Sequence, residues 1–206
     1  MLITKTNTIY LKWCLFSCDK DERRIMLRII SGIYRNGKLE QPDLKITRPT
    51  TDKVREAIFS SLHFKLPGKI ALDLFAGSGA LAIEAVSRGA IQVDAIEKHR
   101  EAYKILNTNL NNLKIENLQT YHNDAIQFLN NIKKQYDFIF IDAPYQEYNL
   151  VNQALDLIIK NKLLQEEGEI ILETDNLTKI SLPSNLIIYK EKKYGKIFVA
   201  YLVKAN

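Results

Sequence analysis

The chain has 206 residues, of which 46% are hydrophobic and 26% are charged, with only 8 Gly and 5 Pro. This composition is typical of a globular protein and excludes a collagen-like or disordered chain. The length allows one well-packed domain with a small appendage, but not two full domains. Because no run of 18 uncharged apolar residues occurs, the sequence predicts no membrane span.

The formal net charge of +5 is unevenly distributed along the chain. Residues 1–68 hold 13 Lys and Arg against 7 Asp and Glu, whereas residues 69–206 hold 16 against 17. A basic segment on a near-neutral body is typical of a protein that faces a polyanion, although an ordinary solvated basic surface has the same charge.

Cysteine content indicates the compartment. Cys14 and Cys18 are too few for a disulfide framework and have no second pair of zinc ligands nearby. We therefore predict a reducing, cytoplasmic environment and no metal site. Residues 1–25 resemble nothing that follows, and we expect them to be a dispensable extension or the result of a misplaced start codon ahead of Met26.

Residues 26–68 are predicted to form a basic, RNA-contacting appendage. A short strand and turn is expected over 27–34, and Pro67 with Gly68 closes the segment. Thr51 is a helix-capping residue, and the spacing of the apolar residues behind it predicts a helix over 52–62. Its apolar face is formed by Val54, Ile58 and Leu62, so that Lys53 and Arg55 are expected to project away from the buried side.

From residue 69 to residue 206, short apolar runs alternate with helical stretches. The expected strands are 70–75, 93–96, 118–122, 138–141 and 170–173, and the expected helices are 81–88, 100–113, 125–133 and 150–160. Strands joined by helical crossovers pair in parallel and bind ligands at their carboxyl ends. Residues 186–190 and 197–203 are predicted to form a terminal hairpin on the same sheet.

The first strand of this domain leads into a glycine-rich turn at a strand-to-helix junction. Such a turn lets the backbone approach a nucleotide-type cofactor closely. Gly77, Gly79 and Ala82 also satisfy the pattern of dinucleotide-binding loops, and Glu97 is placed to pair with ribose hydroxyls in either kind of cofactor. A nicotinamide-dependent oxidoreductase therefore remains open at this point.

Two acids favour S-adenosylmethionine. A carboxylate at Asp73, four residues before Gly77, suits a cofactor with an ammonium group and would crowd a pyrophosphate. Asp124 follows the third strand and is placed to accept a hydrogen bond from an adenine amine, with a helix-capping role as the alternative.

The run Asp142-Ala143-Pro144-Tyr145 directly follows the fourth strand. The lone pair of an amine on an aromatic base is delocalised, so the nitrogen becomes nucleophilic only when its hydrogens are held by acceptors. Asp142 and the carbonyl of Ala143 are two such acceptors, Pro144 stiffens the turn, and Tyr145 offers a ring on which an extruded base stacks.

Four segments together resemble the bacterial 16S ribosomal RNA (guanine-N2) methyltransferase family: 28–32, 48–52 with 54–56, 73–81 and 142–145. The resemblance covers about residues 26–204. It implies an α/β fold with a Rossmann-like class I methyltransferase sheet, mostly parallel with an antiparallel last strand, beside a small N-terminal β-hairpin and helix. It also implies that Glu97 holds the ribose, Asp124 the adenine and 142–145 the target base.

With this resemblance we predict three groups of site residues. The catalytic group is Asp142, Ala143, Pro144 and Tyr145. The cofactor-binding group is Asp73, Phe75, Ala76, Gly77, Ser78, Gly79, Glu97, Lys98, Asp124, Ala125 and Asp142. The RNA-binding group is Arg28, Arg35, Arg48, Thr50, Lys53 and Arg55.

One residue departs from the family pattern, because the family usually has two prolines in the last motif and Ala143 replaces the first. Alanine keeps the carbonyl that would accept an amine hydrogen, so we expect the chemistry to survive with a looser loop. The predicted partner is 16S rRNA or a partly assembled small subunit, with the protein a monomer. A methyltransferase for an adenine amine in DNA or RNA, and a non-catalytic RNA-binding assembly factor, are the alternatives.

Overall fold

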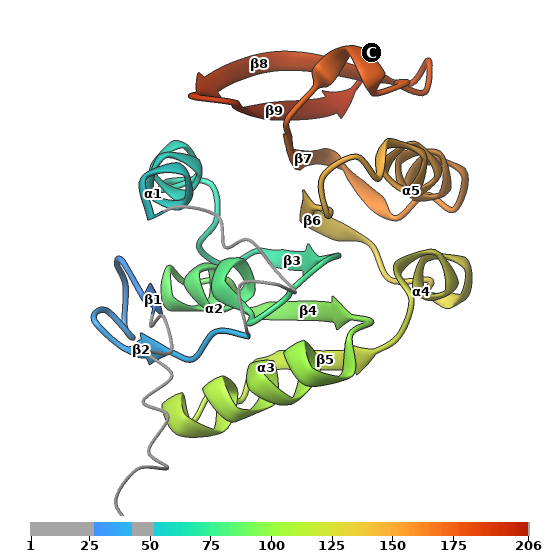
Figure 1. The fold of residues 1–206 in the computed structure, drawn as a ribbon. Helices are drawn as coiled ribbons and strands as arrows, with labels where there is room; N and C mark the ends of the chain where they lie inside the picture. The colour runs from blue at the N-terminus through green and yellow to red at the C-terminus, as the bar shows by residue number, and fades with distance from the viewer. Residues whose placement is uncertain (1–26, 43–51, 206) are drawn as a thin grey trace, which may run out of the picture.

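A mixed seven-stranded sheet forms the centre of the computed structural model, which describes residues 27–42 and 52–205 (Figure 1). The strand order is β5-β4-β3-β6-β7-β9-β8. The strands are β3 (Ile70–Asp73), β4 (Gln92–Glu97), β5 (Leu118–His122), β6 (Tyr136–Asp142), β7 (Leu164–Thr174), β8 (Leu186–Tyr194) and β9 (Ile197–Lys204). β3 to β7 pair in parallel, whereas β9 is antiparallel to both of its neighbours, which confirms the predicted sheet and its reversed last strand.

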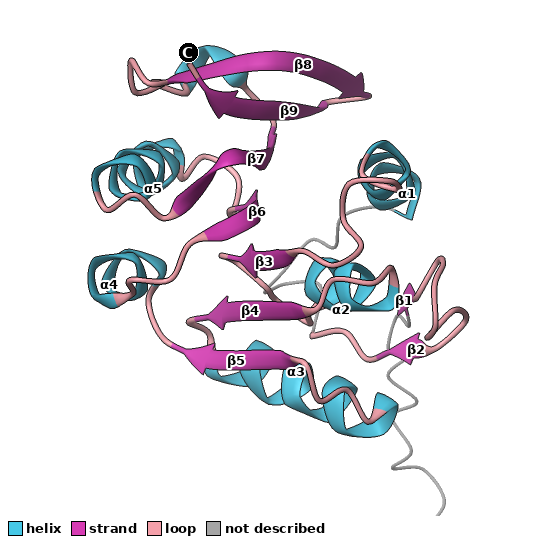
Figure 2. Ribbon diagram, turned by 180° about the vertical axis from the view of Figure 1, so that it is seen from behind, coloured by secondary structure: helices cyan, strands magenta, loops and turns pink. Residues whose placement is uncertain are grey.

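Helices cover both faces of the sheet, as Figure 2 shows. They are α1 (Asp52–Ser61), α2 (Ala80–Ser87), α3 (Arg100–Leu113), α4 (Ala125–Asn131) and α5 (Tyr148–Lys160), and a short 3-10 turn, Leu177–Lys179, follows β7. Strand β6 explains the two layers, because alternate side chains of a strand point to opposite faces. Phe138 and Phe140 join the apolar core with α1, α2 and α3, and Ile139 and Ile141 join the core with α4 and α5.

The chain leaves the middle of the sheet in two directions. From β3 it goes to β4 and β5 on one side, and it then crosses back to β6 and β7 on the other. The loops that follow the adjacent strands β3 and β6 therefore run in opposite directions. This divergence opens a crevice at the carboxyl ends of the two strands.

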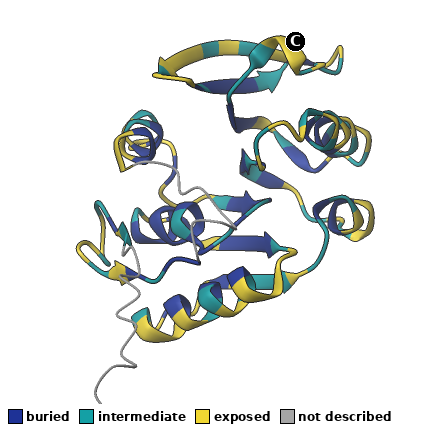
Figure 3. Ribbon diagram, in the orientation of Figure 1, coloured by how far each residue is buried: buried dark blue, intermediate teal, exposed yellow. Residues whose placement is uncertain are grey.

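The segment before the sheet packs against α2. Strands β1 (Leu27–Arg28) and β2 (Lys38–Leu39) form a small antiparallel hairpin. The backbone amides of Ile30 and Ser31 donate to the carboxylate of Glu84 in α2, at 2.8 and 3.1 Å. Because this hairpin covers the outer side of α2, Leu81 to Ser87 are all buried (Figure 3). The predicted extension 1–25 lies outside the described residues.

The predicted orientation of Arg55 is wrong. Helix α1 begins at Asp52 as expected, but the side chain of Arg55 is completely buried, donates to the carbonyl of Arg28 at 2.6 Å and to Asp52 at 3.0 Å, and lies 3.9 Å from Glu84. The buried face of α1 is wider than expected because it includes Arg55 and Phe59 beside Val54 and Ile58. A carboxylate buried at Glu84 needs a cation nearby, and Arg55 supplies one. Arg55 is therefore unable to reach RNA phosphates.

Among the described residues, no helix is both long and apolar enough to cross a membrane.

Candidate functional site

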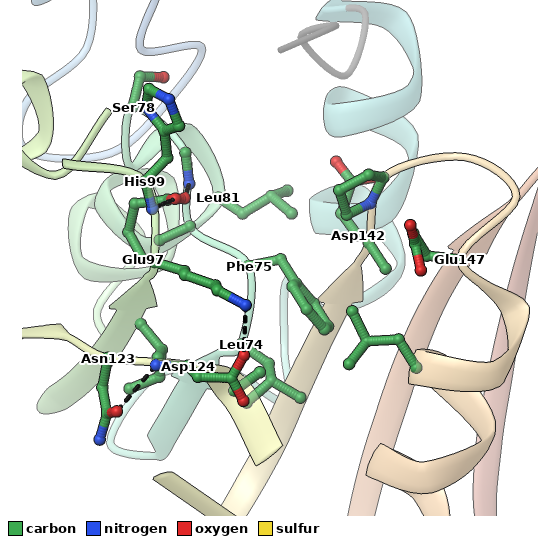
Figure 4. Close-up of a pocket in the computed structure, with 18 of the residues that line it drawn as sticks. Leu74, Phe75, Ser78, Leu81, Glu97, His99, Asn123, Asp124, Asp142 and Glu147 are labelled. Atoms are coloured by element: carbon green, nitrogen blue, oxygen red, sulfur yellow. Dashed lines mark hydrogen bonds and ion pairs between the residues drawn. The ribbon is translucent and has the colours of Figure 1, made fainter. Parts of the chain in front are cut away.

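A cavity of about 1140 Å³ lies at the carboxyl ends of β3, β4, β5 and β6. Figure 4 shows two groups of side chains in its wall. Glu97, His99 and Asp124 lie on one side, Asp142 and Glu147 lie on the other, and Phe75 lies between them. The predicted site residues that line it are Phe75, Ala76, Gly77, Ser78, Glu97, Lys98, Asp124, Ala125, Asp142, Ala143, Pro144 and Tyr145.

The two glycines of the loop after β3 serve different purposes. Both have positive φ angles, 55° at Gly77 and 86° at Gly79, which side chains rarely tolerate. A Cβ on Gly77 would meet no atom within 4 Å, so the absent side chain leaves backbone exposed at the cavity. A Cβ on Gly79 would lie 2.3 Å from a methyl of Leu106, so Gly79 allows close helix packing and lies behind the cavity wall.

Backbone amides fix the carboxylate of Glu97 at the end of β4. One oxygen accepts from the amide of Gly77 at 2.8 Å, and the other accepts from the amide of His99 at 2.6 Å. Each oxygen has capacity for a further hydrogen bond. This geometry provides a rigid acceptor pair at the cavity, which is the arrangement that vicinal hydroxyls of a ribose require.

Asp124 caps α4, as one of its two predicted roles requires, and its second carboxylate oxygen lies at the cavity. One oxygen caps α4 by accepting from the amides of Ile126 and Gln127, at 3.0 and 3.3 Å. The other accepts from Lys98 at 2.9 Å, and this hydrogen bond lowers the pKa of Asp124 below its usual value. The carboxylate therefore remains ionised at the cavity wall, where an amine donor would find an acceptor.

Asp73 lies beneath the cavity instead of in its wall. It is 1% exposed, and one of its oxygens accepts from the amide of Ala82 at 3.1 Å, which ties the end of β3 to the start of α2. Its other oxygen has no hydrogen-bond partner. Burial, together with the charge of Asp142, raises the pKa of Asp73 to about 7. This placement does not support the predicted direct contact with a cofactor ammonium group.

The 142–145 turn forms the far side of the cavity. Asp142 ends β6 and is partly exposed, Ala143 is buried, and Tyr145 is partly exposed. The carbonyl of Pro144 accepts from the amide of Glu147 at 3.2 Å, which closes a turn before α5. Because Phe140 pairs with Asp73 in the neighbouring strand, the turn lies beside the glycine loop, as the sequence predicted.

The sequence reasoning missed several residues of the cavity. Gln41, which follows β2, donates to the hydroxyl of Ser78 at 2.6 Å, and Asn109 of α3 clamps both segments by donating to the carbonyls of Glu40 and Ser78 at 3.0 Å each. No local pattern marks Gln41 or Asn109, because their role arises from tertiary packing. Other lining residues that the sequence did not mark are His99, Arg100 and Asn123 after β4 and β5, and Glu147, Asn149, Leu150 and Gln153 before and within α5.

Of the predicted RNA-binding residues, those that the structure describes do not line the cavity. Arg28 and Arg35 in the N-terminal hairpin and Lys53 in α1 are exposed. Arg48 and Thr50 lie outside the residues that the structure describes.

Comparison with known proteins shows a consistent set of relatives. Ribosomal RNA small subunit methyltransferase D of Buchnera aphidicola subsp. Baizongia pistaciae is 38% identical, over 91% of this chain and 96% of the relative. The protein of the same name from Escherichia coli K12 is 35% identical, over 83% of this chain and 86% of the relative. The putative rRNA methyltransferase YlbH of Bacillus subtilis is 36% identical, over 86% of this chain and 99% of the relative.

Solved structures agree with the sequence relatives. A putative methyltransferase, yhhF, from Escherichia coli superposes with a TM-score of 0.79 at 32% identity, covering 87% of this chain and 98% of that chain. A putative methylase, HI0767, from Haemophilus influenzae has a TM-score of 0.75 at 30% identity, covering 88% and 100%.

The sheet order, the reversed last strand and the cavity at the switch point define a class I methyltransferase fold. Residues 27–203 match the family model described as conserved hypothetical protein 95. The chain belongs to this family, together with the small-subunit methyltransferase D relatives, and the resemblance inferred from its motifs is confirmed.

Proposed function

We propose that this chain transfers a methyl group from S-adenosylmethionine to the exocyclic N2 amine of a guanine in 16S rRNA. The observation that carries the proposal is the two-sided cavity, with the carboxylates of Glu97 and Asp124 on the β4–β5 side and the 142–145 turn on the β6 side. Its volume of about 1140 Å³ exceeds the roughly 300–1,000 Å³ of a typical small-molecule pocket, so a cofactor and a base fit together. The names of the relatives support an rRNA substrate.

The described residues fit the cofactor. The carboxylate of Glu97 would hold the ribose hydroxyls, Asp124 would accept from the adenine amine, and the exposed backbone at Gly77 would face the methionine part. Leu74 and Ile96 provide an apolar wall for the adenine ring. A donor held by these groups would have its methyl group directed towards β6.

The cofactor supplies a methyl group that is already activated, so the protein mainly aligns the acceptor and excludes water. Asp142 and the carbonyl of Ala143 would accept hydrogen bonds from the two amine hydrogens, which directs the nitrogen lone pair at the donor. Tyr145 would stack on the extruded base. The amine becomes acidic as the bond forms, and Asp142 or water takes the proton without a dedicated base.

The substrate side of the proposal rests on charge. Arg28, Arg35 and Lys53 are exposed cations on the segment before the sheet and would contact phosphates, with Arg48 and Thr50 assigned to the same role. In this proposal residues 26–68 act as the RNA-contacting appendage of a cytoplasmic enzyme. The substrate is 16S rRNA, alone or in a partly assembled subunit.

Analysis of the product nucleoside tests the proposal. Small subunits and naked 16S rRNA from cells that lack the gene are incubated with the protein and methyl-deuterated cofactor, digested to nucleosides and analysed by mass spectrometry. The expected product is labelled N2-methylguanosine. Labelled N6-methyladenosine, or no labelled nucleoside from either substrate, would contradict the assignment of the base.

A further inference from the structure

The turn between β8 and β9 carries a second basic surface, in a part of the chain that the overall charge count leaves near neutral. Residues 189–196 contain four lysines, Lys190, Lys192, Lys193 and Lys196, and one acid, Glu191. Lys192, Lys193 and Lys196 are exposed, and we call these three residues the hairpin tip. Gly195, with a φ of 64°, makes the tight turn that presents Lys196.

The lysines of the hairpin tip form no ion pair with any described residue. Some other lysines are neutralised locally, as in the pairs Lys69–Asp137, Lys134–Asp94 and Lys204–Glu166, the last at the opposite end of the same hairpin. Burial, followed by the nearby charges of Lys192 and Lys65, lowers the pKa of Lys190 below its usual value, so the proposed contact relies on the three exposed lysines and not on Lys190. An uncompensated cluster of cations is the electrostatic footprint of a polyanion partner.

Aromatic side chains shape this surface as well. The ammonium group of Lys190 lies 4.3 Å from the ring centre of Tyr201, and that of Lys193 lies 4.8 Å from the ring centre of Phe198. Such contacts restrict long side chains that would otherwise be mobile, and they lower the entropy that a phosphate contact must overcome.

The register of the sheet places the hairpin tip in line with the proposed base-binding turn. Asp142 pairs with Glu173, Glu173 pairs with Val199, and Val199 pairs with Lys192. Three strand spacings of about 4.8 Å separate Asp142 from Lys192, roughly 14 Å along one row of the sheet. Lys193 pairs with Phe198, which pairs with Thr174 at the end of β7, and Lys196 follows in the turn between β8 and β9.

We propose that the hairpin tip binds the phosphate backbone of the RNA next to the nucleotide whose base enters the cavity. This inference rests on the proposed function and extends it, because it adds a contact on the C-terminal side of the cavity to the N-terminal cations. The RNA is then held on both sides of the target. The tip contributes to binding and register, not to the chemical step.

Matched charge-removal variants test the hairpin tip. The test variant is Lys192→Gln/Lys193→Gln/Lys196→Gln. The control is Lys133→Gln/Lys160→Gln/Lys162→Gln. It removes three exposed lysines that lie near the amino ends of β6 and β7. Affinity for naked 16S rRNA is measured for both variants and the wild type over a series of salt concentrations, with thermal unfolding and cofactor affinity as folding controls.

The test variant is expected to bind RNA about tenfold more weakly or worse. Its plot of log affinity against log salt should lose about two units of slope, since each lost single-strand phosphate contact removes about 0.7. Single-turnover methylation at saturating RNA should match the wild type, and the control variant should match the wild type throughout.

Two results would overturn the inference while leaving the proposed function intact. One is a test variant whose RNA affinity and salt slope equal those of the control. The other is crosslinking from a photoreactive group at position 196 to a ribosomal protein of the bound subunit instead of rRNA, since the hairpin tip would then contact protein. Failure of the wild type itself to bind or methylate small-subunit rRNA would instead overturn the proposed function.

Discussion

The carboxylates of Glu97 and Asp73 differ in burial and in the hydrogen bonds that they accept. Glu97 accepts one backbone amide on each oxygen and faces the cavity, whereas Asp73 is buried with one oxygen unpartnered. A charged acceptor that is fixed by amides binds neutral hydroxyls well. A buried carboxyl with an unpartnered oxygen instead tends to hold its proton.

Replacement of Glu97 with Gln tests the ribose site. Gln offers only one acceptor oxygen, so the amide of Gly77 or His99 loses its partner and the ribose loses a charged acceptor. We expect cofactor affinity to fall by about 10- to 100-fold, equivalent to about 1.5–3 kcal/mol. Calorimetric titration checks this, with Glu101→Gln on the exposed first turn of α3 as the control. Unchanged affinity in Glu97→Gln would remove Glu97 from the ribose site.

Replacement of Asp73 with Asn tests its raised pKa. Between about pH 4, where a carboxyl in the unfolded chain titrates, and pH 7, only the folded state retains the proton. The stability of the wild type therefore falls as the pH rises through this window, relative to Asp73→Asn, which has no proton to lose. The difference in the free energy of unfolding should grow by about 1 kcal/mol per pH unit and level off above pH 7. Urea unfolding from pH 4.5 to 8 measures it, and a constant difference would contradict the raised pKa.

Replacement of Asp142 with Ala tests the acceptor of the amine hydrogens. Turnover at saturating cofactor and RNA is expected to fall by about 100-fold or more, because a hydrogen-bond acceptor that orients the reacting nitrogen is lost. Cofactor affinity should stay within about threefold of the wild type. Asp156→Ala, on the exposed side of α5, is the control. A large loss of cofactor affinity would show that Asp142 binds the donor instead of the base.

At the scale of elements, a buried ion cluster joins three segments. Glu84 in α2 accepts from the amides of Ile30 and Ser31 and from Arg88 at 2.7 Å, and it lies near Arg55 of α1. The N-terminal hairpin and α1 are thus anchored on the helix that begins at the glycine loop. This cluster holds the described parts of the appendage, the hairpin and α1, against α2.

Two substitutions in α1 distinguish the structural role of Arg55 from the proposed RNA contact of Lys53. Arg55→Met removes a buried partner of Glu84 and should lower the free energy of unfolding by about 3 kcal/mol, while the salt slope of RNA binding stays unchanged. Lys53→Gln should leave the stability unchanged and lower that slope by about 0.7. Urea unfolding and salt-dependent RNA binding measure both. The reverse pattern would contradict both assignments.

The sequence predicted elements more accurately than side-chain directions. Helix 100–113 and strand 118–122 have the predicted bounds, and the helix buries residues at helical spacing. β7 begins at Leu164, six residues before the predicted strand, because its charged start has no apolar run. Arg55 was misplaced because nothing local reveals that α2 buries a glutamate against it.

Within the site, the cavity wall was predicted best where a motif follows a strand. The loop residues 75–78, the acid Glu97 and the 142–145 turn line the cavity, since parallel strands bring their carboxyl ends together. Gln41 was missed because its contact with Ser78 arises from tertiary packing. The position of the hairpin tip relative to the 142–145 turn depends on strand order and register, which arise from long-range pairing. The roles of these residues in binding and catalysis remain predictions.

At the scale of the whole molecule, the account depends on one cavity in which donor and base meet between β3 and β6. The most direct measurement is a crystal structure with S-adenosylmethionine bound. We expect the adenine at Asp124, the ribose hydroxyls on Glu97 and the sulfonium methyl group directed at Asp142 and Tyr145. A cofactor bound outside this cavity, or one whose methyl group points away from the 142–145 turn, would contradict the account.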